Sequence, residues 1–568
     1  MTSLDLRPLQ TVLSDNAQKG RPFLIPALLT AQDLYGYIPQ NAAVEISKVL
    51  CVPLADVFGV IDFYALLHSK PANKTILHIC NDPVCAMAGS EALLKEFSSI
   101  RNKQEYTIER APCLGLCEHA PALMVKDVQR GDVIVDAQRG PLEDIGQKPY
   151  GIIGGESRTV TINCGKQRAT TLPEYISSGG YTSLKKALSI QPAEIINEVK
   201  ESGLVGRGGA AFPTGIKWES AAKETAQPKY VICNADEAEP GTFKDRVLLE
   251  EDPHRIIEGL VIAAYAVGAH AGYIFLRGEY TNAFEVISVA LADARQGGYL
   301  GENILGSGFQ FDIELFRGAG AYVCGEETAL FEAIEGKRGF PRMKPPFPTT
   351  KGLFNRPTVI NNVETLCNIP SIITLGSAGY RKLGTEKSPG TKLFCLSGDV
   401  KTPGLYEVPF GVTLRHLIYD LAGGIRAGGT LKAILLGGAA GAFTDEAALD
   451  VRLTFEDLRA NNLPLGSGVV TVFDQTRDIR DAVLRIAAFF ANESCGKCYP
   501  CQIGTQRQLE IIQRLAAGKL IPGDKERLTD IYWTMTDASI CGLGQTAASA
   551  VLSVLKLWPD LFQESGTY

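Results

Sequence analysis

Eight of the fourteen cysteines fall into two groups whose spacing suits metal-cluster chemistry. In the first group, Cys80 and Cys85 have four residues between them, and Cys113 and Cys117 have three. Four thiolates in two loop-borne pairs can hold two irons, because iron–sulfur clusters are bound by cysteine thiolates. Two alternatives stay open: a zinc site, whose cysteine pairs usually show finger-like spacing, and buried thiols that bind nothing.

The second group has a more specific spacing. Cys495, Cys498 and Cys501 follow a C-x-x-C-x-x-C pattern, and Cys541 lies forty residues further on. Three close thiolates and a distant fourth are typical of a [4Fe–4S] cluster, and Gly496 permits the turn that such a loop needs. Unligated cysteines are again the alternative. The six remaining cysteines are isolated, and we expect them to be small buried hydrophobic residues.

A glycine-rich loop occupies residues 203–217. Gly206, Gly208 and Gly209 leave the backbone amides free to approach a phosphate or a flavin ring. The loop matches neither the dinucleotide fingerprint nor a Walker loop, and a glycine-rich surface turn is the alternative. Lys217 would place a point charge near a phosphate if it is not simply a solvated lysine.

Polar clusters follow two strand-like runs, at 230–233 and 311–316. Ligands of open α/β sheets bind beyond the carboxyl ends of strands, and amides and carboxylates suit sugar or ribityl hydroxyls. A solvated acidic loop is the alternative for the first cluster. The helix dipole alone would explain acidic residues at the start of the helix that follows the second run. The clusters, with a third set near residue 361, contain Asn234, Asp236, Glu237, Glu239, Tyr322, Gly325, Glu326, Glu327, Asn361, Asn362 and Thr365.

The elements that position these groups change along the chain. Apolar residues recur at helical spacing before residue 50, and a strand-like run covers 75–80. A stretch rich in glycine and polar residues, 126–169, predicts a linker. An α/β region follows, then a smaller region of strand and turn signals near 390–470, and the last hundred residues are helical.

The chain resembles the flavin subunit of the complex I peripheral arm. The resemblance rests on the motifs G-R-G-G-A-A-F-P-T-G-x-K-W, C-N-A-D-E-x-E-P-G-T-F-K-D-R, G-A-G-A-Y-x-C-G-E-E-T-A-L, N-N-V-E-T and E-S-C-G-K-C-x-P-C. The same set occurs in the diaphorase subunits of NAD-reducing hydrogenases and NAD-dependent formate dehydrogenases. The resemblance covers about residues 170–568, and the first 125 residues look like the thioredoxin-like [2Fe–2S] subunit of such complexes.

The resemblance implies a multidomain α/β fold. The expected parts are a thioredoxin-like [2Fe–2S] domain with N-terminal helices (1–125), the linker (126–169), a Rossmann-like domain that binds FMN and NAD(H) (170–388), a small β-grasp domain (389–472) and a helical [4Fe–4S] domain (473–568). Val205 stands where an arginine often precedes G-R-G-G, whereas Arg207 is retained. We expect little consequence from this departure.

The resemblance also implies roles for individual residues. Phe212 would stack near NAD(H), with Glu239 and Glu327 lining its pocket and Lys217 close to the flavin or the nucleotide. Cys80, Cys85, Cys113 and Cys117 would hold the [2Fe–2S] cluster, and Cys495, Cys498, Cys501 and Cys541 the [4Fe–4S] cluster. The remaining cofactor-binding set, around FMN, is Gly206, Arg207, Gly208, Gly209, Asn234, Asp236, Glu237, Tyr322, Gly325, Glu326, Asn361, Asn362 and Thr365.

The expected function is that of an NADH dehydrogenase (diaphorase) subunit, in which FMN converts between hydride exchange and single-electron transfer. Because both cluster types share one chain, we favour a cytosolic NAD-reducing [NiFe] hydrogenase, with an iron–sulfur electron-transfer subunit and hydrogenase subunits as partners. A formate dehydrogenase subunit, a fused complex I subunit and a non-catalytic electron-relay scaffold are the alternatives. No protein acid or base is expected in the hydride step.

The overall composition limits other interpretations. The formal net charge of -7 argues against a nucleic-acid-binding surface. The sequence has no uninterrupted apolar run long enough to cross a bilayer. Its first twenty residues show neither a secretory signal core nor a transit pattern. We therefore expect a cytoplasmic protein that does not insert into a membrane.

Overall fold

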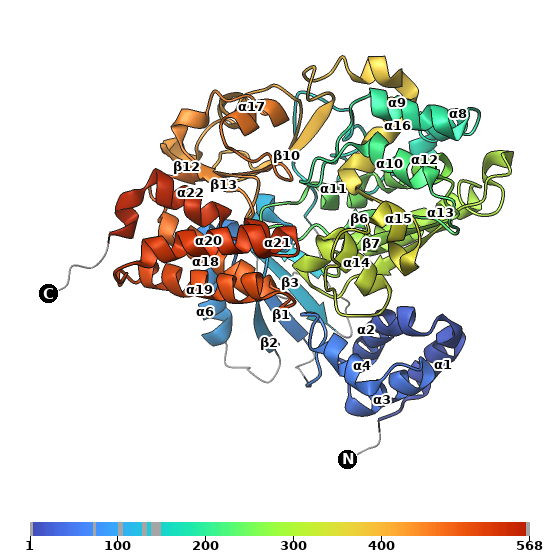
Figure 1. Ribbon diagram of the computed structural model, residues 1–568, viewed down its shortest axis with the longest axis horizontal. Coiled ribbons are helices and arrows are strands. Elements are labelled where there is room, and N and C mark those ends of the chain that lie inside the picture. Colours follow the sequence, from blue (N-terminus) through green and yellow to red (C-terminus); the bar gives the residue numbers. More distant parts are fainter. Residues whose placement is uncertain (1–3, 72–74, 100–105, 128–132, 138–148, 564–568) are drawn as a thin grey trace.

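The chain folds into an N-terminal helical layer, three β-sheets and a C-terminal helix bundle (Figure 1). The computed structural model describes residues 4–71, 75–99, 106–127, 133–137 and 149–563. The N-terminal layer lies at the lower right of Figure 1. Its helices are α1 (Arg7–Asn16), α2 (Leu24–Tyr35), α3 (Gln40–Val49) and α4 (Leu54–Ile61). Apolar residues at helical spacing, such as Leu9, Leu28 and Ile46, are fully buried between them.

The first sheet is mixed and has the strand order β2-β1-β3-β4. The predicted strand at 75–80 is present as β1, which pairs parallel with β2 and antiparallel with β3. One face of β1 packs Leu77 and Ile79 with Leu94 of α6. Its other face carries His78 and Cys80, because side chains alternate along a strand. The elements are β1 (Thr75–Cys80), α5 (Pro83–Met87), α6 (Ser90–Ser99), β2 (Tyr106–Ala111), β3 (Ala122–Asp127) and β4 (Val133–Asp136).

The segment 126–169, predicted as a linker, contributes strands to two sheets. β4 pairs antiparallel with β3 and so extends the first sheet to Asp136. β5 (Ile153–Gly155) pairs parallel with β11 of the β-grasp sheet. Short edge strands next to glycine and polar residues show little hydrophobic periodicity, so the sequence pattern does not predict them. Glu407 of β11 fixes the following turn by accepting hydrogen bonds from the amides of Thr159, Val160 and Thr161 at 2.9–3.1 Å.

The second sheet is entirely parallel, with the order β8-β7-β6-β9. The strands β6 and β7 are mostly apolar and buried, whereas β8 alternates between buried and exposed residues. The runs predicted at 230–233 and 311–316 lie in this sheet. The strands are β6 (Tyr230–Ala235), β7 (Ala271–Leu276), β8 (Asp312–Arg317) and β9 (Thr358–Asn362). The helices are α7 (Leu172–Ser177), α8 (Thr182–Ala187), α9 (Pro192–Glu201), α10 (Thr214–Lys223), α11 (Lys244–Glu251), α12 (Pro253–Val267), α13 (Thr281–Gln296), α14 (Glu327–Ile334), α15 (Pro348–Lys351) and α16 (Val363–Tyr380).

The third sheet has the order β13-β12-β14-β10-β11-β5 and forms the β-grasp region. Its further elements are β10 (Thr391–Gly398), β11 (Gly404–Pro409), β12 (Leu431–Leu436), β13 (Ala442–Thr444), α17 (Phe455–Ala460) and β14 (Val469–Asp474). The helical C-terminal part follows at the left of Figure 1. Its helices are α18 (Ile479–Glu493), α19 (Tyr499–Ala516), α20 (Asp524–Ala538), α21 (Gly542–Thr546) and α22 (Ser549–Leu557).

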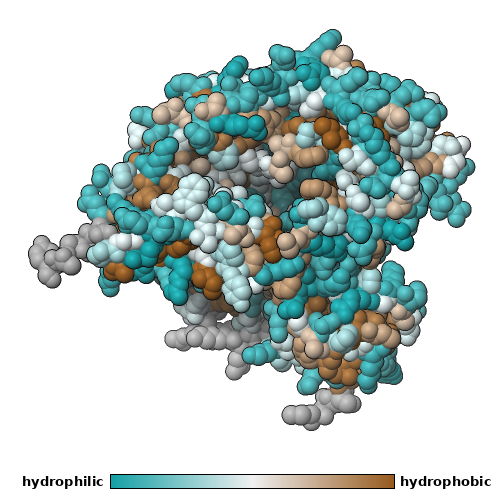
Figure 2. Space-filling view, viewed as in Figure 1, coloured by the Kyte–Doolittle hydropathy of each residue, from teal (hydrophilic) through white to brown (hydrophobic). Residues whose placement is uncertain are grey.

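The visible surface is mainly hydrophilic, with hydrophobic side chains scattered among polar ones (Figure 2). Within the described part of the chain, no helix combines the length and the hydropathy needed to cross a membrane. The expectation that the six isolated cysteines are buried is wrong for Cys51, which is exposed. Cys51 follows the end of α3 with a φ of 53°, a turn position on the surface of the helical layer. The other five are buried.

Candidate functional site

Polar clusters from three strand ends meet at one edge of the parallel sheet. Parallel strands place their carboxyl ends at the same edge, and Asn234 of β6 is in register with Asn362 of β9. The segment after β8 reaches the same place, because Asn234 Nδ2 donates a 2.9 Å hydrogen bond to the carbonyl of Gly325. The fold therefore brings the three sequence clusters together.

The glycine-rich loop lies against this edge. Arg207 N donates to Thr365 Oγ1 at 2.9 Å, and Gly206 N donates to the carbonyl of Phe212 at 2.9 Å. A Cβ atom at Gly208 would lie only 3.0 Å from Asn362 Cβ, closer than ordinary packing allows. Gly209 has a φ of 121°, which side-chain-bearing residues rarely adopt. The loop thus presents bare backbone to whatever occupies the sheet edge.

The polar groups at the edge fit a ligand that carries hydroxyls. Asp236 Oδ2 is buried and has no hydrogen-bond partner among the described residues. Burial raises the pKa of Asp236 well above its usual range. An unsatisfied buried oxygen costs about 1–3 kcal/mol, so a ligand hydroxyl would be favoured there. Ser467 Oγ is also buried without a partner in this part of the structure, and its backbone N lies 3.9 Å from the Cβ position of Gly209.

Glu239 lies where three domains meet. Its carboxylate accepts hydrogen bonds from Tyr322 OH and, at 2.8 Å, from Ala440 N of the β-grasp region. Burial raises the pKa of Glu239. Tyr322 in turn donates its backbone N–H to Glu493 of α18 at 2.9 Å. Tyr322 therefore connects Glu239 to the helix that leads into Cys495.

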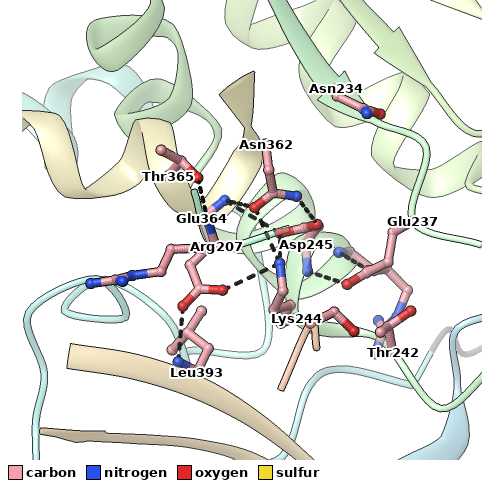
Figure 3. A network of polar contacts seen from close by, with 12 residues as sticks. Arg207, Asn234, Glu237, Thr242, Lys244, Asp245, Asn362, Glu364, Thr365 and Leu393 are labelled. Carbon is pink, nitrogen blue, oxygen red and sulfur yellow. Dashed lines mark hydrogen bonds and ion pairs between the residues drawn. The ribbon is translucent and has the colours of Figure 1, made fainter. Parts of the chain in front are cut away.

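A buried network of charges supports the edge from below (Figure 3). Glu364 accepts from Lys392 Nζ at 2.6 Å and lies 3.3 Å from Lys244 Nζ, which contacts Asp245 at 2.7 Å. Two ammonium groups and two carboxylates thus balance in a site that solvent hardly reaches. Asn362 belongs to the same network, because its Nδ2 donates to Asp245 Oδ2 at 2.6 Å.

The charges in this network shift one another's ionisation. Burial lowers the pKa of Lys392 to about 8 against the opposing attraction of Glu364. Burial alone would raise the pKa of Glu364, but the ammonium groups of Lys392 and Lys244 outweigh it and lower that pKa. Glu364 also accepts from the amide of Leu393 at 2.9 Å. Its ionised form is therefore the one that joins α16 to β10.

Some predicted site residues have side chains that already form hydrogen bonds to protein groups, although Arg207 Nε has no partner among the described residues. The guanidinium of Arg207 points into the core and donates to the carbonyl of Pro389 at 3.0 Å. Asn361 Oδ1 accepts from Trp218 Nε1 at 2.8 Å. Glu237 accepts from the amides of Asp245 and Arg246, each at 2.9 Å, and burial raises its pKa to about 7. Because these side chains already bond protein atoms, their main role is to hold the site in place.

Glu326 behaves as the helix-dipole alternative predicts. It is the N-cap of α14, and its carboxylate accepts from the amides of Thr328 and Ala329 at 2.8 and 3.0 Å. Such a cap satisfies amides that have no partner within the helix. Lys344 also pairs with Glu326 at 2.9 Å. The cap explains Glu326 without any ligand.

The outer rim of the site combines an aromatic ring with paired charges. Phe212 is 51% exposed, and Lys217 Nζ lies 5.9 Å from its ring centroid. Lys217 donates to the carbonyl of Ile360 at 2.9 Å, and burial lowers its pKa. Glu327 pairs with Lys344 at 2.7 Å and lies 4.0 Å from Lys217. An exposed ring beside such charges suits a base and a phosphate-bearing ligand.

The four cysteines of the first group line one cavity. All four thiols are buried, and the sulfurs of Cys113 and Cys117 are 3.4 Å apart. Gly115 N points at Cys113 Sγ at 3.4 Å, and Ala122 N at Cys85 Sγ at 3.5 Å. Amide donors aimed at cysteine sulfurs are a typical feature of iron–sulfur sites. The convergence of four thiols fits a cluster and leaves none of them as an isolated core residue.

Two arginines dock this cysteine loop onto the parallel sheet. Arg246 Nε donates to the carbonyl of Gly115 at 2.7 Å, and its guanidinium pairs with Glu118. Arg277, directly after β7, donates to the carbonyl of Cys113 and, at 2.9 Å, to that of Glu237. Burial raises the pKa of Glu118 to about 7, against the lowering effect of Arg246. The cysteine loop is therefore fixed by the end of β7 and by α11, which belong to the same domain as the polar edge.

The four cysteines of the second group line another cavity. Cys498 precedes α19 and Cys541 precedes α21, so both sulfurs lie at helix N-termini. The positive end of a helix favours an anionic group such as a thiolate-bound cluster. Val323, next to Tyr322, forms part of the wall. Both cysteine cavities therefore border elements that reach the polar edge.

Sequence reasoning missed several residues that hold the site. Lys244, Asp245, Glu364, Lys392 and Ser467 were not singled out, although the first three lie inside the motifs given above. The sequence feature that could have identified the first three is a charged residue next to apolar ones, as in T-F-K-D-R and N-N-V-E-T. The pairing of Lys392 with Glu364 spans 28 residues and carries no local signal.

Comparison with known proteins assigns a family to each region. Residues 10–145 match the thioredoxin-like [2Fe–2S] ferredoxin family, 199–371 the Nuo51 FMN-binding domain, 392–472 the SLBB domain and 481–565 the iron–sulfur binding region of NADH-ubiquinone oxidoreductase F. These matches agree with the three sheets and the helix bundle.

Individual relatives are closely similar. The NADH-quinone oxidoreductase F 2 protein of Rhizobium meliloti (strain 1021) is 49% identical over 68% of this chain and 92% of its own length. The NADP-reducing hydrogenase protein HndC of Solidesulfovibrio fructosivorans is 45% identical over 72% of this chain and 83% of its own. A chain of an NAD+-reducing [NiFe]-hydrogenase in the air-oxidized state matches with a TM-score of 0.83 and 33% identity, over 97% of this chain and 95% of its own.

A flavin-binding α/β domain joined to two cysteine-lined cavities defines an iron–sulfur flavoprotein oxidoreductase. The chain belongs to the NADH-quinone oxidoreductase F family, which includes related hydrogenase subunits. It is an NAD(H)-dependent oxidoreductase with FMN, one [2Fe–2S] and one [4Fe–4S] cluster as cofactors, and the zinc alternative for the first cysteine group is set aside. The assignment of individual ligand residues stays a prediction.

The buried network predicts coupling between Glu364 and Lys392. Glu364→Gln and Lys392→Met should each cost about 3 kcal/mol, because each leaves buried charge without its partner. The double variant keeps the Lys244–Asp245 pair, so its cost should fall short of the sum by at least about 1 kcal/mol. Flavin release during heating, followed by fluorescence, measures the effect. Glu386→Gln, at an exposed carboxylate, is the control, and additive shifts would contradict the coupling.

The two cysteine groups predict separable clusters. Cys541→Ser should remove about four of about six irons per chain and leave the [2Fe–2S] signal, whereas Cys113→Ser should remove about two and leave the [4Fe–4S] signal. Iron analysis and electron paramagnetic resonance of the reduced protein measure both. Cys367→Ser, at an isolated buried thiol, is the control and should retain both signals. Loss of both signals from each ligand variant would contradict independent sites.

Proposed function

We propose that this chain is the diaphorase subunit of an NAD-reducing [NiFe] hydrogenase. The proposal rests on how much of this chain each relative matches. The chain of the NAD+-reducing [NiFe]-hydrogenase matches 97% of this chain and 95% of its own. The NADH-quinone oxidoreductase F proteins of Rhizobium meliloti and Aquifex aeolicus match only 68% and 70% of this chain. The combination of all regions in one chain is therefore shared with the hydrogenase chain.

Residues of the polar edge hold the flavin in this proposal. When bound, FMN supplies the conversion between hydride exchange with NAD(H) and single-electron transfer. The residues that would hold it are the bare backbone of the Gly206–Gly209 loop and the polar side chains of Asp236 and Asn234, which would bind its hydroxyls. Asn362 keeps one orientation because Asp245 and Lys244 hold both ends of its amide.

The rim binds the nucleotide. Phe212 offers an exposed ring face, and Lys217 contributes a positive charge near it. Glu327 opposes the negatively charged nucleotide, and its pairing with Lys344 moderates that repulsion. Glu239 lies deeper, held by Tyr322, and shapes the inner wall. The carboxylates thus tune affinity and hydration, and the chemistry of the hydride step belongs to the cofactors.

The remaining assignments follow from the same proposal. Cys80, Cys85, Cys113 and Cys117 hold the [2Fe–2S] cluster, and Cys495, Cys498, Cys501 and Cys541 hold the [4Fe–4S] cluster. The partners are an iron–sulfur electron-transfer subunit and the hydrogenase subunits, and the complex is cytoplasmic. Hydrogen chemistry belongs to a partner.

The variant Glu327→Gln tests whether the outer rim binds the nucleotide. Removing one negative charge and releasing Lys344 should lower the KM for NADH by roughly 3- to 10-fold, since about 1 kcal/mol corresponds to a factor of about 5. Flavin content should stay unchanged, because Glu327 lies outside the polar edge. NADH oxidation with an artificial acceptor measures the KM. An unchanged KM, or loss of flavin, would remove this role; Glu386→Gln is the matched control.

Isolation of the complex from its native source tests the parent assembly. The proposal expects a nickel-containing partner and hydrogen-dependent reduction of NAD+ by the purified complex. Formate-dependent reduction of NAD+ would instead identify a formate dehydrogenase. Copurified quinone-reducing subunits would identify a complex I. A protein that contains both clusters but fails to oxidise NADH with any acceptor would be the electron-relay scaffold.

A further inference from the structure

Two histidines and a glutamate converge at a place unconnected with either cysteine group. His68 follows α4, His78 lies in β1 and Glu109 lies in β2. One ring nitrogen from each histidine and one carboxylate oxygen all lie within 4.8 Å of one another. His78 and Glu109 are partners in the register of the two parallel strands. The group thus joins two neighbouring strands to a loop of the helical layer.

The backbone holds His68 in place from the helical side. Its amide donates to Gln32 Oε1 at 2.7 Å, and its carbonyl accepts from Ile38 N at 2.8 Å. The imidazole rings of His68 and His78 stack with centroids 6.4 Å apart. The three side chains therefore come from fixed backbone positions, which is what a preorganised ligand set requires.

Both histidines bury a ring nitrogen without satisfying it. Nε2 of His68 and Nε2 of His78 have no hydrogen-bond partner within the described ranges. Only 5% of the His78 side chain is exposed, against 35% of that of Glu109. An ion at these rings would therefore break no hydrogen bond made by either Nε2. On His78 the nitrogen next to the Glu109 carboxylate is Nδ1. The partly exposed carboxylate provides an entry path from solvent.

The distances suit a tetrahedral ion. His78 Nδ1 lies 3.4 Å from Glu109 Oε2. Ligand bonds of about 2.0–2.1 Å to zinc place two tetrahedral ligands roughly 3.4 Å apart. The three ligand atoms lie within 4.8 Å of one another, so His68 would have to approach by at most about 1.4 Å to complete a three-ligand set, with water in the fourth position as in open zinc sites.

The local charge selects the kind of ion. Lys126 of β3 is close enough to act on both rings. Its charge opposes that of Glu109, so long-range attraction for a cation is weak here. Imidazole coordination must supply the affinity, which excludes calcium and magnesium and favours zinc.

We propose that His68, His78 and Glu109 bind one zinc ion that fastens the N-terminal helical layer to the thioredoxin-like sheet. The ion links the loop after α4 to both β1 and β2. The site is separate from the two cysteine groups, and its proposed role is to join these two parts of the fold. Because zinc binds the folded form, it stabilises the junction by mass action.

Zinc binding to the cluster-loaded protein tests the proposal. Protein with its full iron content is washed with a chelator, dialysed against one equivalent of Zn²⁺, and analysed for metal. One zinc per chain should remain, and X-ray absorption at the zinc edge should show nitrogen and oxygen ligands at about 2.0–2.2 Å without sulfur at about 2.3 Å. His68→Gln and Glu109→Gln should each weaken binding at least ~10-fold. His270→Gln, at an exposed histidine bonded to the carbonyl of Gln310, should bind as the parent does.

Three outcomes would overturn the site. These are no retained zinc in protein that keeps its iron, zinc held by sulfur, and unchanged affinity in either ligand variant. Each variant is judged only if its iron content equals that of the parent, which shows that it has folded. The two substitutions lie on different elements, so one folded variant is enough for a decision.

Discussion

The site depends on one buried carboxylate, that of Glu364, and on the two ammonium groups that neutralise it. Glu364 lies in the first turn of α16, Lys392 belongs to β10 of the β-grasp sheet, and Lys244 starts α11. A buried charge persists only when its partners are in place, so these elements hold together as a unit. Through Lys244 and Asp245 the same unit fixes the amide of Asn362 at the end of β9. The glycine-rich loop then packs against Asn362.

The cysteine sites extend this arrangement outward. Arg246 and Arg277 bind backbone carbonyls of the 113–117 loop from the flavin domain. Tyr322 joins Glu239 to Glu493, which ends α18 two residues before Cys495. Each cysteine cavity therefore has walls from more than one domain. An electron-transfer protein gains from this construction, because a rigid shared wall keeps cofactor positions constant between turnovers.

Strongly patterned elements could be predicted from the sequence, and weakly patterned ones could not. The runs at 75–80 and 230–233 became β1 and β6 because apolar runs between turn residues form buried strands. β4 and β5 were hidden in an expected linker, since four- and three-residue edge strands depend on partners elsewhere in the chain. Glu326 shows a second limit: a helix cap and a ligand-binding carboxylate look alike until the amides that it accepts from are located.

The sequence by itself determined the chemistry available: eight cysteines in two spacings, a glycine-rich loop, and polar residues after strands. These are local properties, fixed by spacing along the chain and by backbone sterics. Tertiary structure decided which groups face outward. It turned Arg207 and Asn361 toward the core, left Asp236 Oδ2 without a protein partner among the described residues, and paired Lys392 with Glu364. Those outcomes depend on contacts between distant segments, where burial and charge compensation act only after the chain has folded.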